Sequence, residues 1–104
     1  MQGPKIVTLC GSTRFKEEFI EANKTETLKG HIVISVGLFG HHEGLDMGGE
    51  TKKMLDELHL RKIDLSSEIL VINVDDYIGD STKKEIKYAE RNGKKVRYLE
   101  PHHE

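Results

Sequence analysis

The chain has 104 residues, of which 33% are charged and 36% hydrophobic, and its formal net charge at pH 7 is -2. This length allows one domain with a single core, and the charge gives no long-range attraction to nucleic acid or to an anionic membrane. The single cysteine, Cys10, excludes an intramolecular disulfide, and no segment resembles a membrane span or a secretion signal, so we expect a soluble cytoplasmic domain.

Strand-like and helix-like segments alternate along the chain. Four short segments rich in β-branched residues are the predicted strands, which are residues 5–10, 31–36, 68–74 and 95–100. The predicted helices, 12–29, 51–65 and a segment ending at Asn92-Gly93, lie between them. The glycine-rich residues 37–49 lack apolar periodicity, and we predict a mobile loop there.

This β-α-β-α-β-α-β order predicts an α/β fold with helical crossovers between parallel strands. We expect a small doubly wound (Rossmann- or flavodoxin-like) three-layer sandwich with a four-stranded, mainly parallel sheet. Residues 1–104 would form one domain, with a core over 5–99 and a tail over 100–104, of which the last four residues, 101–104, would be frayed. Ligands of such sheets bind beyond the carboxyl ends of the strands, which here are the loops 11–14, 37–49 and 75–81.

The turn CGSTR after the first strand has two interpretations. In one, Gly11 permits a tight turn, backbone N–H groups at a helix start favour an anion, and Arg14 adds a two-pronged contact to phosphate. In the other, Ser12 or Thr13 merely caps the helix and Arg14 is solvated. We interpret Cys10 as a buried small hydrophobe. The phosphate fingerprints of ATP-binding and dinucleotide-binding proteins are absent.

Glu85 presents a similar choice in the segment after the third strand. The sequence TKKE (82–85) matches the [ST]-x-x-E capping box, in which Glu85 bonds back to the N–H of Thr82. If Asp80 or Ser81 caps the helix instead, Glu85 is released into the cleft above the strand ends. The helix N-terminus would then help keep it ionised, as a carboxylate nucleophile requires.

The histidines His41, His42 and His59 are weak candidates for metal ligands. They show no H-x-x-x-H spacing, no cysteine partner and no supporting carboxylate spacing, so we expect no metal site. Asp56 and His59 lie at i and i+3 on the second predicted helix. They are candidates for contacting a base or a sugar hydroxyl, with a surface pair as the alternative.

Three segments, VTLCGSTRF (7–15), KIDLSSEILVINV (62–74) and GDSTKKEIKYA (79–89), together resemble the nucleoside 2-deoxyribosyltransferase-like superfamily. This superfamily includes the deoxynucleoside 5'-monophosphate N-glycosidases, and the similarity spans about residues 5–99. The resemblance implies that Glu85 is the nucleophile that attacks C1' of the sugar. It also implies that the turn containing Gly11, Ser12 and Arg14 binds the 5' end of the substrate.

The resemblance further implies a polar residue shortly before the nucleophile that contacts sugar or phosphate. The family position six before the nucleophile, usually Asp or Ser, is Gly79 here, so Asp80 or Ser81 would take this role. A residue that orients the base or sugar has three competing matches, which are Asp56, His59 and Asp64.

We therefore predict an N-glycosidase that cleaves a (deoxy)nucleoside 5'-monophosphate through a covalent glycosyl-Glu85 intermediate, without metal or organic cofactor. Attack by a second base in place of water would make it a nucleoside 2-deoxyribosyltransferase. The alternatives are a nucleotide-binding or sensing module, in which Glu85 is only a capping acid, and a purely structural interaction domain. We expect the 37–49 loop to close over a nucleotide or nucleoside ligand and a homodimer to complete the site.

Overall fold

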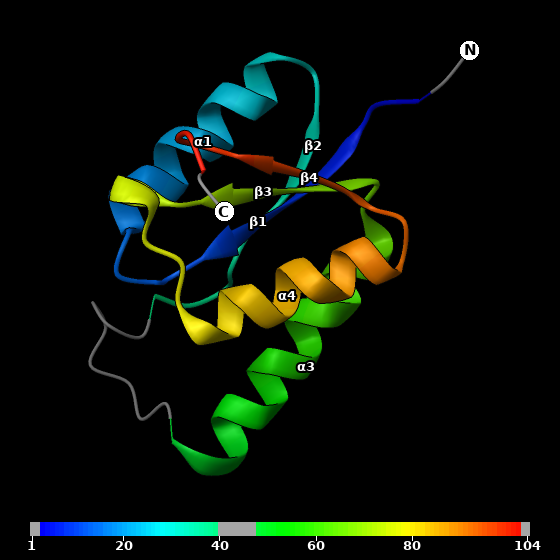
Figure 1. Cartoon of the computed structure of the whole chain (residues 1–104). Coiled ribbons are helices and arrows are strands. Elements are labelled where there is room, and N and C mark those ends of the chain that lie inside the picture. The colour runs from blue at the N-terminus through cyan, green and yellow to red at the C-terminus, as the bar shows by residue number, and fades with distance from the viewer. Residues whose placement is uncertain (1–2, 40–47, 103–104) are drawn as a thin grey trace.

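The computed structural model describes residues 3–39 and 48–102 (Figure 1). Its strands are β1 (Ile6–Gly11), β2 (Ile32–Ile34), β3 (Glu68–Ile72) and β4 (Lys95–Tyr98). Its helices are α1 (Lys16–Leu28), α3 (Gly49–Leu65), α4 (Asp80–Arg91) and the short 3-10 helix η1 (Val74–Asp76). The predicted alternation of strands and helices is confirmed.

The four strands form one sheet in the order β2-β1-β3-β4, and every neighbouring pair is parallel. The prediction of a mainly parallel sheet is therefore confirmed, and the observed sheet is parallel throughout. The chain passes from β1 to the edge strand β2 and then returns across β1 to β3. This reversal places the topological switch point between the carboxyl ends of β1 and β3, where doubly wound folds bind ligands.

Alternating side chains of β1 and β3 divide the core between the two faces of the sheet. On one face, Leu9 and Leu70 belong to the cluster that packs around Phe19 of α1. On the other face, Cys10 and Val71 belong to the cluster formed with α3 and α4. Figure 1 shows α1 on one side of the sheet and α3 with α4 on the other. This arrangement confirms the small doubly wound, Rossmann-like fold.

Helix α1 begins at Lys16, four residues later than predicted. A turn occupies the intervening residues, because the Phe15 N–H donates to Ser12 O (3.1 Å) and the Arg14 N–H donates to Ser12 Oγ (3.3 Å). Phe15 is the N-cap and makes no side-chain capping bond. The prediction that Ser12 or Thr13 caps the helix is therefore wrong. The prediction that this turn lies at the start of the helix is also wrong, because the turn ends before the helix begins.

The chain segment 100–102 lies against the end of β3, so the prediction of a frayed tail is wrong for its described residues, 101 and 102. The buried Asn73 donates to the Glu100 carbonyl oxygen (3.0 Å) and accepts from the Glu100 N–H (2.9 Å). His102 stacks on Tyr98 and pairs with Asp76 (2.9 Å). Strand β3 ends at Ile72, two residues before the predicted end at residue 74.

A buried ionic network lies between α1 and the sheet. Arg97 of β4 donates to the Glu26 carboxylate on α1 (2.6 Å) and to the Glu68 carboxylate on β3 (2.8 Å). His31 and Lys29 also contact Glu26, at 2.9 and 3.1 Å. Burial alone would raise the pKa of Glu26, but the bonds from Arg97, His31 and Lys29 outweigh it and lower the pKa to about 2.

Among the described residues, no helix is both long enough and apolar enough to cross a membrane.

Candidate active site

A cleft of about 650 Å³ opens at the switch point, above the carboxyl ends of β1 and β3. The turn after β1, the segment after β2, helix α3 and the start of α4 line it. The predicted site residues that line this cleft are Gly11, Ser12, Thr13, Arg14, Asp56, His59, Gly79, Ser81 and Glu85. The fold therefore brings together three segments that lie far apart in the sequence.

Asp80 is the predicted site residue that does not line the cleft. It is the first residue of α4, and an α-helix rotates about 100° per residue. Ser81, Thr82 and Glu85 consequently share the side that faces the cleft, while Asp80 points to the other side. Of the two residues to which the resemblance assigns this role, Ser81 lines the cleft and Asp80 does not.

The capping-box interpretation of Glu85 is also wrong. Helix α4 begins at Asp80 with Gly79 as its N-cap, and the Lys83 N–H already donates to the Gly79 carbonyl oxygen (3.0 Å). Thr82 is the third residue of the helix, so Glu85 lies in the second turn and cannot bond back to an N-cap residue. No side chain caps α4, and the early start of the helix is what turns Glu85 toward the cleft.

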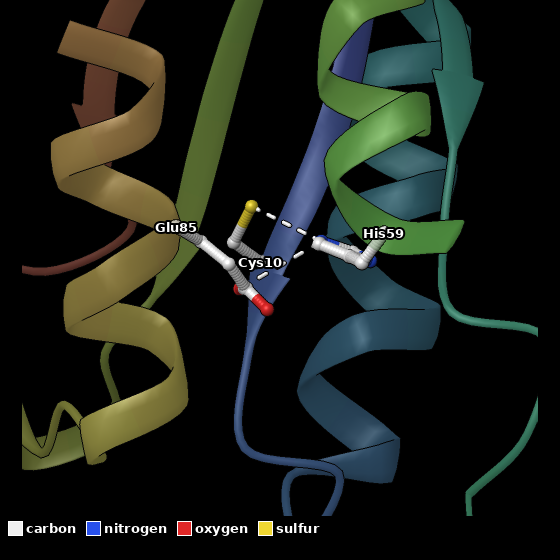
Figure 2. A group of neighbouring side chains, drawn as sticks. All are labelled: Cys10, His59 and Glu85. Carbon is white, nitrogen blue, oxygen red and sulfur yellow. Dashed lines mark hydrogen bonds and ion pairs between the residues drawn. The ribbon is translucent and has the colours of Figure 1, made fainter. Parts of the chain in front are cut away.

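Glu85 lies beside Cys10 and His59, as Figure 2 shows. His59 and Glu85 line the cleft and Cys10 is fully buried behind them, so the cluster lies at the inner end of the cleft. The His59 Nε2 atom lies 3.3 Å from Cys10 Sγ and 3.7 Å from Glu85 Oε1. The three side chains come from three elements, β1, α3 and α4. Cys10 is fully buried, whereas the Glu85 side chain keeps 14% of its surface exposed and so connects the cluster with the cleft.

The surroundings of this cluster favour uncharged forms of all three groups. Burial raises the pKa of Glu85 to about 7, and the negative charge of Asp56 adds to the rise. Burial also lowers the pKa of His59 to about 4. Burial, together with the charge and hydrogen bond of Glu85, raises the pKa of the Cys10 thiol well above its ordinary value. The expectation that the helix N-terminus keeps Glu85 ionised is therefore wrong, because desolvation dominates.

Lys52 connects the two helices across the cleft mouth. Its Nζ atom donates to Asp56 Oδ2 on α3 (2.9 Å) and to Ser81 Oγ on α4 (3.2 Å). Its charge also opposes the rise in the pKa of Glu85. Asp56 therefore takes part in the electrostatics of Glu85 as well as lining the cleft.

Tyr77 lines the cleft and packs against the turn that follows β1. The guanidinium carbon of Arg14 lies 4.5 Å above the centre of the Tyr77 ring, and the Phe15 ring meets the same ring edge-on. A Cβ atom at Gly79 would lie 3.4 Å from the Tyr77 hydroxyl, which is an ordinary van der Waals contact, so the packing of Tyr77 does not require glycine there. Such cation–π contacts fix the plane of a guanidinium.

Gly11 lies at the contact between the two central strands. It pairs with Ile72, and a Cβ atom there would lie 2.9 Å from the Ile72 carbonyl oxygen. Only glycine allows this approach, which positions the turn of Ser12 and Arg14 directly beside the end of β3.

Two further sequence predictions have different outcomes. Asp64 accepts a hydrogen bond from the Tyr88 hydroxyl (2.6 Å) and pairs with Arg61 away from the cleft, so it is no longer a competitor for a role in the site. Gly37 and Leu38 line the cleft, but residues 40–47, with His41 and His42, lie outside the described residues. Loop closure over a ligand stays a prediction.

Sequence reasoning missed several residues of the site, among them Cys10, Lys52 and Tyr77. The signal for Cys10 was its position next to the end of β1, on the face opposite Leu9. Lys52 lies one helical turn before Asp56, so the helical spacing that paired Asp56 with His59 could also have identified Lys52 as their neighbour. Nothing in the sequence pointed to Tyr77.

No family model matches the chain, and a search of curated proteins finds no match.

Proposed function

We propose that the protein is an N-glycosidase that cleaves a (deoxy)nucleoside 5'-monophosphate, with Glu85 as the nucleophile. The observation that supports this proposal best is the position of Glu85. It is the partly exposed carboxylate at the inner end of a cleft located where doubly wound folds bind ligands. A cleft of about 650 Å³ is also of the size that holds a nucleotide-sized ligand.

The proposed reaction has two steps at C1' of the sugar. An oxygen of Glu85 bonds to C1', the C1'–N bond breaks, and its electron pair leaves on the base, which is protonated. Water then attacks C1', its hydroxyl group stays on the sugar, its proton passes to solvent, and the Glu85 carboxylate is regenerated. The products are a free base and a sugar 5'-phosphate.

The raised pKa of Glu85 suits this role in one respect and limits it in another. A carboxylate that is poorly solvated is a stronger nucleophile once it is ionised, because no water shell has to be removed before attack. At a pKa of about 7, however, half of the molecules carry the inactive acid form at neutral pH. The neutral His59 lies beside the carboxylate as a polar neighbour without a competing charge.

The turn from Gly11 to Arg14 is the proposed site of the 5'-phosphate. Arg14 offers a positive charge and paired N–H donors, and its stacking on Tyr77 holds it at the wall of the cleft. Lys52 adds a second positive charge at the cleft mouth. A bare 5'-hydroxyl gains little from either cation, which favours a nucleotide over a nucleoside.

The direct test incubates the chelator-treated protein with a panel of nucleoside and deoxynucleoside monophosphates and the matching nucleosides, and detects free base by chromatography. We expect base release from at least one monophosphate and slower release from its nucleoside. A second base added to the reaction distinguishes sugar transfer from hydrolysis. Stabilisation by a monophosphate without any base release would contradict the enzyme proposal and favour the binding module.

The pH dependence of base release tests the role of Glu85 separately. Because only the ionised carboxylate attacks, kcat/KM should rise with pH through about 7 and be roughly 100-fold lower at pH 5 than on its plateau. The substrate phosphate also titrates near this range. Asp56→Asn is the control, since removing this charge should move a midpoint that belongs to Glu85 to lower pH. The charge of Asp56 also raises the pKa of His59, but that pKa is about 4, well below the expected midpoint. A midpoint unchanged by Asp56→Asn would assign the profile to another group.

A nucleotide-binding module without turnover is the second candidate. The observation that favours it is the burial of Glu85, which raises the pKa of this carboxyl to about 7, since a protonated Glu85 is a ligand-binding group and not a nucleophile.

We further propose that the protein is cytoplasmic and forms a homodimer. The lone Cys10 thiol supports the first part, and Met54 and Leu58, about half exposed one turn apart on α3, support the second. Leu58 also lines the cleft, so a partner on this face would adjoin the site.

A further inference from the structure

The cluster of Cys10, His59 and Glu85 contains three side-chain types that bind transition metals. Each residue offers one donor atom, and all three donors lie within 4.8 Å of one another. The Sγ and Nε2 atoms lie 3.3 Å apart, and the Nε2 and Oε1 atoms lie 3.7 Å apart. Zinc bonds of about 2.0–2.3 Å in a tetrahedron place neighbouring donors roughly 3.3–3.6 Å apart. The two pairs that share His59 Nε2 are thus spaced close to what a common ion requires, and the third pair, Cys10 Sγ and a Glu85 carboxylate oxygen, lies within 4.8 Å.

A thiol-based catalytic triad is the main alternative for the same three residues. That alternative requires an accessible thiol with a lowered pKa. Cys10 is fully buried and burial raises the pKa of its thiol, so the sulfur is neither reachable nor activated toward a substrate. A metal ion differs from a substrate in this respect, because it is small enough to enter from the Glu85 side of the cluster.

We propose that Cys10, His59 and Glu85 form a binding site for a divalent transition-metal ion, with Zn²⁺ as the best fit. One sulfur, one nitrogen and one oxygen donor match the borderline-soft character of Zn²⁺ and exclude Mg²⁺ and Ca²⁺, which select oxygen ligands. A thiolate and a carboxylate also balance the two charges of the ion. This balance removes the cost of ionising two buried acids side by side.

The surroundings of the cluster fit the same proposal. The apolar side chains of Ile63, Val71 and Ala89 pack in the same core cluster as Cys10, and an apolar shell strengthens metal–ligand attraction. The exposed part of Glu85 faces the cleft, so a fourth coordination position would be open to water or a ligand. Three protein ligands with one open position is the arrangement of reactive zinc sites and differs from the closed sites of structural zinc.

The metal site would use the side chain that the proposed glycosidase needs as its nucleophile. Zn²⁺ and a nucleotide sugar would then compete for Glu85, and the metal would act as a reversible inhibitor and not as a cofactor. The metal proposal itself depends only on the geometry of the three donors and stands whether or not the protein is a glycosidase.

The test titrates Co²⁺, a spectroscopic substitute for Zn²⁺, into chelator-treated protein. Wild type should develop the intense visible bands of four-coordinate cobalt and a near-ultraviolet sulfur-to-cobalt charge-transfer band, and Zn²⁺ should displace both. Cys10→Ala should lose the charge-transfer band. It should also bind Zn²⁺ at least ~100-fold more weakly, since even residues behind the ligands are typically worth 10–100-fold in affinity.

Controls separate this site from adventitious binding by histidines. All six histidines of the chain remain in Cys10→Ala, so any binding they provide survives in that variant. His102→Gln removes an imidazole that pairs with Asp76 and should leave Zn²⁺ affinity unchanged. Glu85→Gln, on the cleft side of the cluster, is a second loss-of-ligand variant in case Cys10→Ala folds poorly. Thermal melting without metal verifies the fold of each variant.

Zn²⁺ should raise the melting temperature of wild type but not of the Cys10→Ala or Glu85→Gln variants. The absence of a charge-transfer band in wild type, or equal Zn²⁺ affinity in wild type and both ligand variants, would overturn the proposal. None of these readouts uses a nucleotide. The metal site can therefore fail while base release is observed, and the reverse outcome is equally distinguishable.

Discussion

Glu85→Gln should lower base release from nucleoside monophosphates by at least ~10³-fold, since loss of a covalent nucleophile removes most of an enzyme's rate acceleration. Glutamine has nearly the shape of glutamic acid, but its amide forms no glycosyl ester. The measurement is free base per enzyme under single-turnover conditions with chelator present. Glu90→Gln, which changes an exposed acid on the same helix, should retain wild-type activity.

Glu85→Gln should also preserve nucleotide binding, which separates chemistry from folding. The group it replaces is already half protonated at neutral pH, so the variant loses little charge and keeps polar atoms beside Cys10 and His59. We expect a melting temperature close to that of wild type and a Kd for the monophosphate within a few-fold. Activity above a tenth of wild type in this variant would show that another group performs the attack.

Arg97→Ala should destabilise the fold by about 3 kcal/mol or more, because it leaves two buried carboxylates without their shared cation. The side chains of Glu26 and Glu68 are only 3% and 4% exposed, so water cannot replace the guanidinium. Urea denaturation at pH 7 measures the free energy of unfolding. Arg61→Ala is the matched control, since Arg61 pairs with Glu57 and Asp64 at the surface and should cost less than about 1 kcal/mol.

The ionic network around Arg97 should also make the free energy of unfolding depend on pH. Glu26 has a folded-state pKa of about 2, below its unfolded value near 4.5, so its contribution is fully present above pH 4.5 and is lost as the pH falls toward 2. That contribution is roughly 3 kcal/mol. Arg97→Ala should reduce this acid-dependent loss. Combining it with Glu26→Gln and Glu68→Gln should recover stability, and a triple variant no more stable than Arg97→Ala would argue against the loss of the Arg97 charge beside these carboxylates as the cause.

Most of the fold was predictable because hydrophobic periodicity reports burial directly. The continuous apolar run at 69–72 identifies a strand covered on both faces, and Phe19 and Ala22 mark the inner face of α1. Helix starts were less predictable. Serine and threonine are good caps in general, but Ser12 bonds to Arg14 within a turn, and no side chain caps α4. The packing of each helix on the sheet therefore outweighed the preference of serine and threonine for the N-cap position.

The candidate site was predictable in its location and only partly in its chemistry. The switch-point rule places the Gly11–Arg14 turn and Glu85 in one cleft without any knowledge of contacts. Metal binding was set aside because no ligand spacing exists along the chain. The cluster of Cys10 and His59 with Glu85 arises from β1, α3 and α4, so linear spacing carries no information about it. The pKa of Glu85 was missed for the same reason, since desolvation depends on tertiary packing.

The pairing of β1 with β3 at the centre of the sheet has a consequence for how the chain folds. Val7 pairs with Glu68, roughly sixty residues later, so the central ladder forms only after a long loop has closed. Local hairpins cannot nucleate a sheet in which every neighbouring pair is parallel. We therefore expect slow, topology-limited folding, and during synthesis the first strand must wait for most of the chain before it gains its main partner.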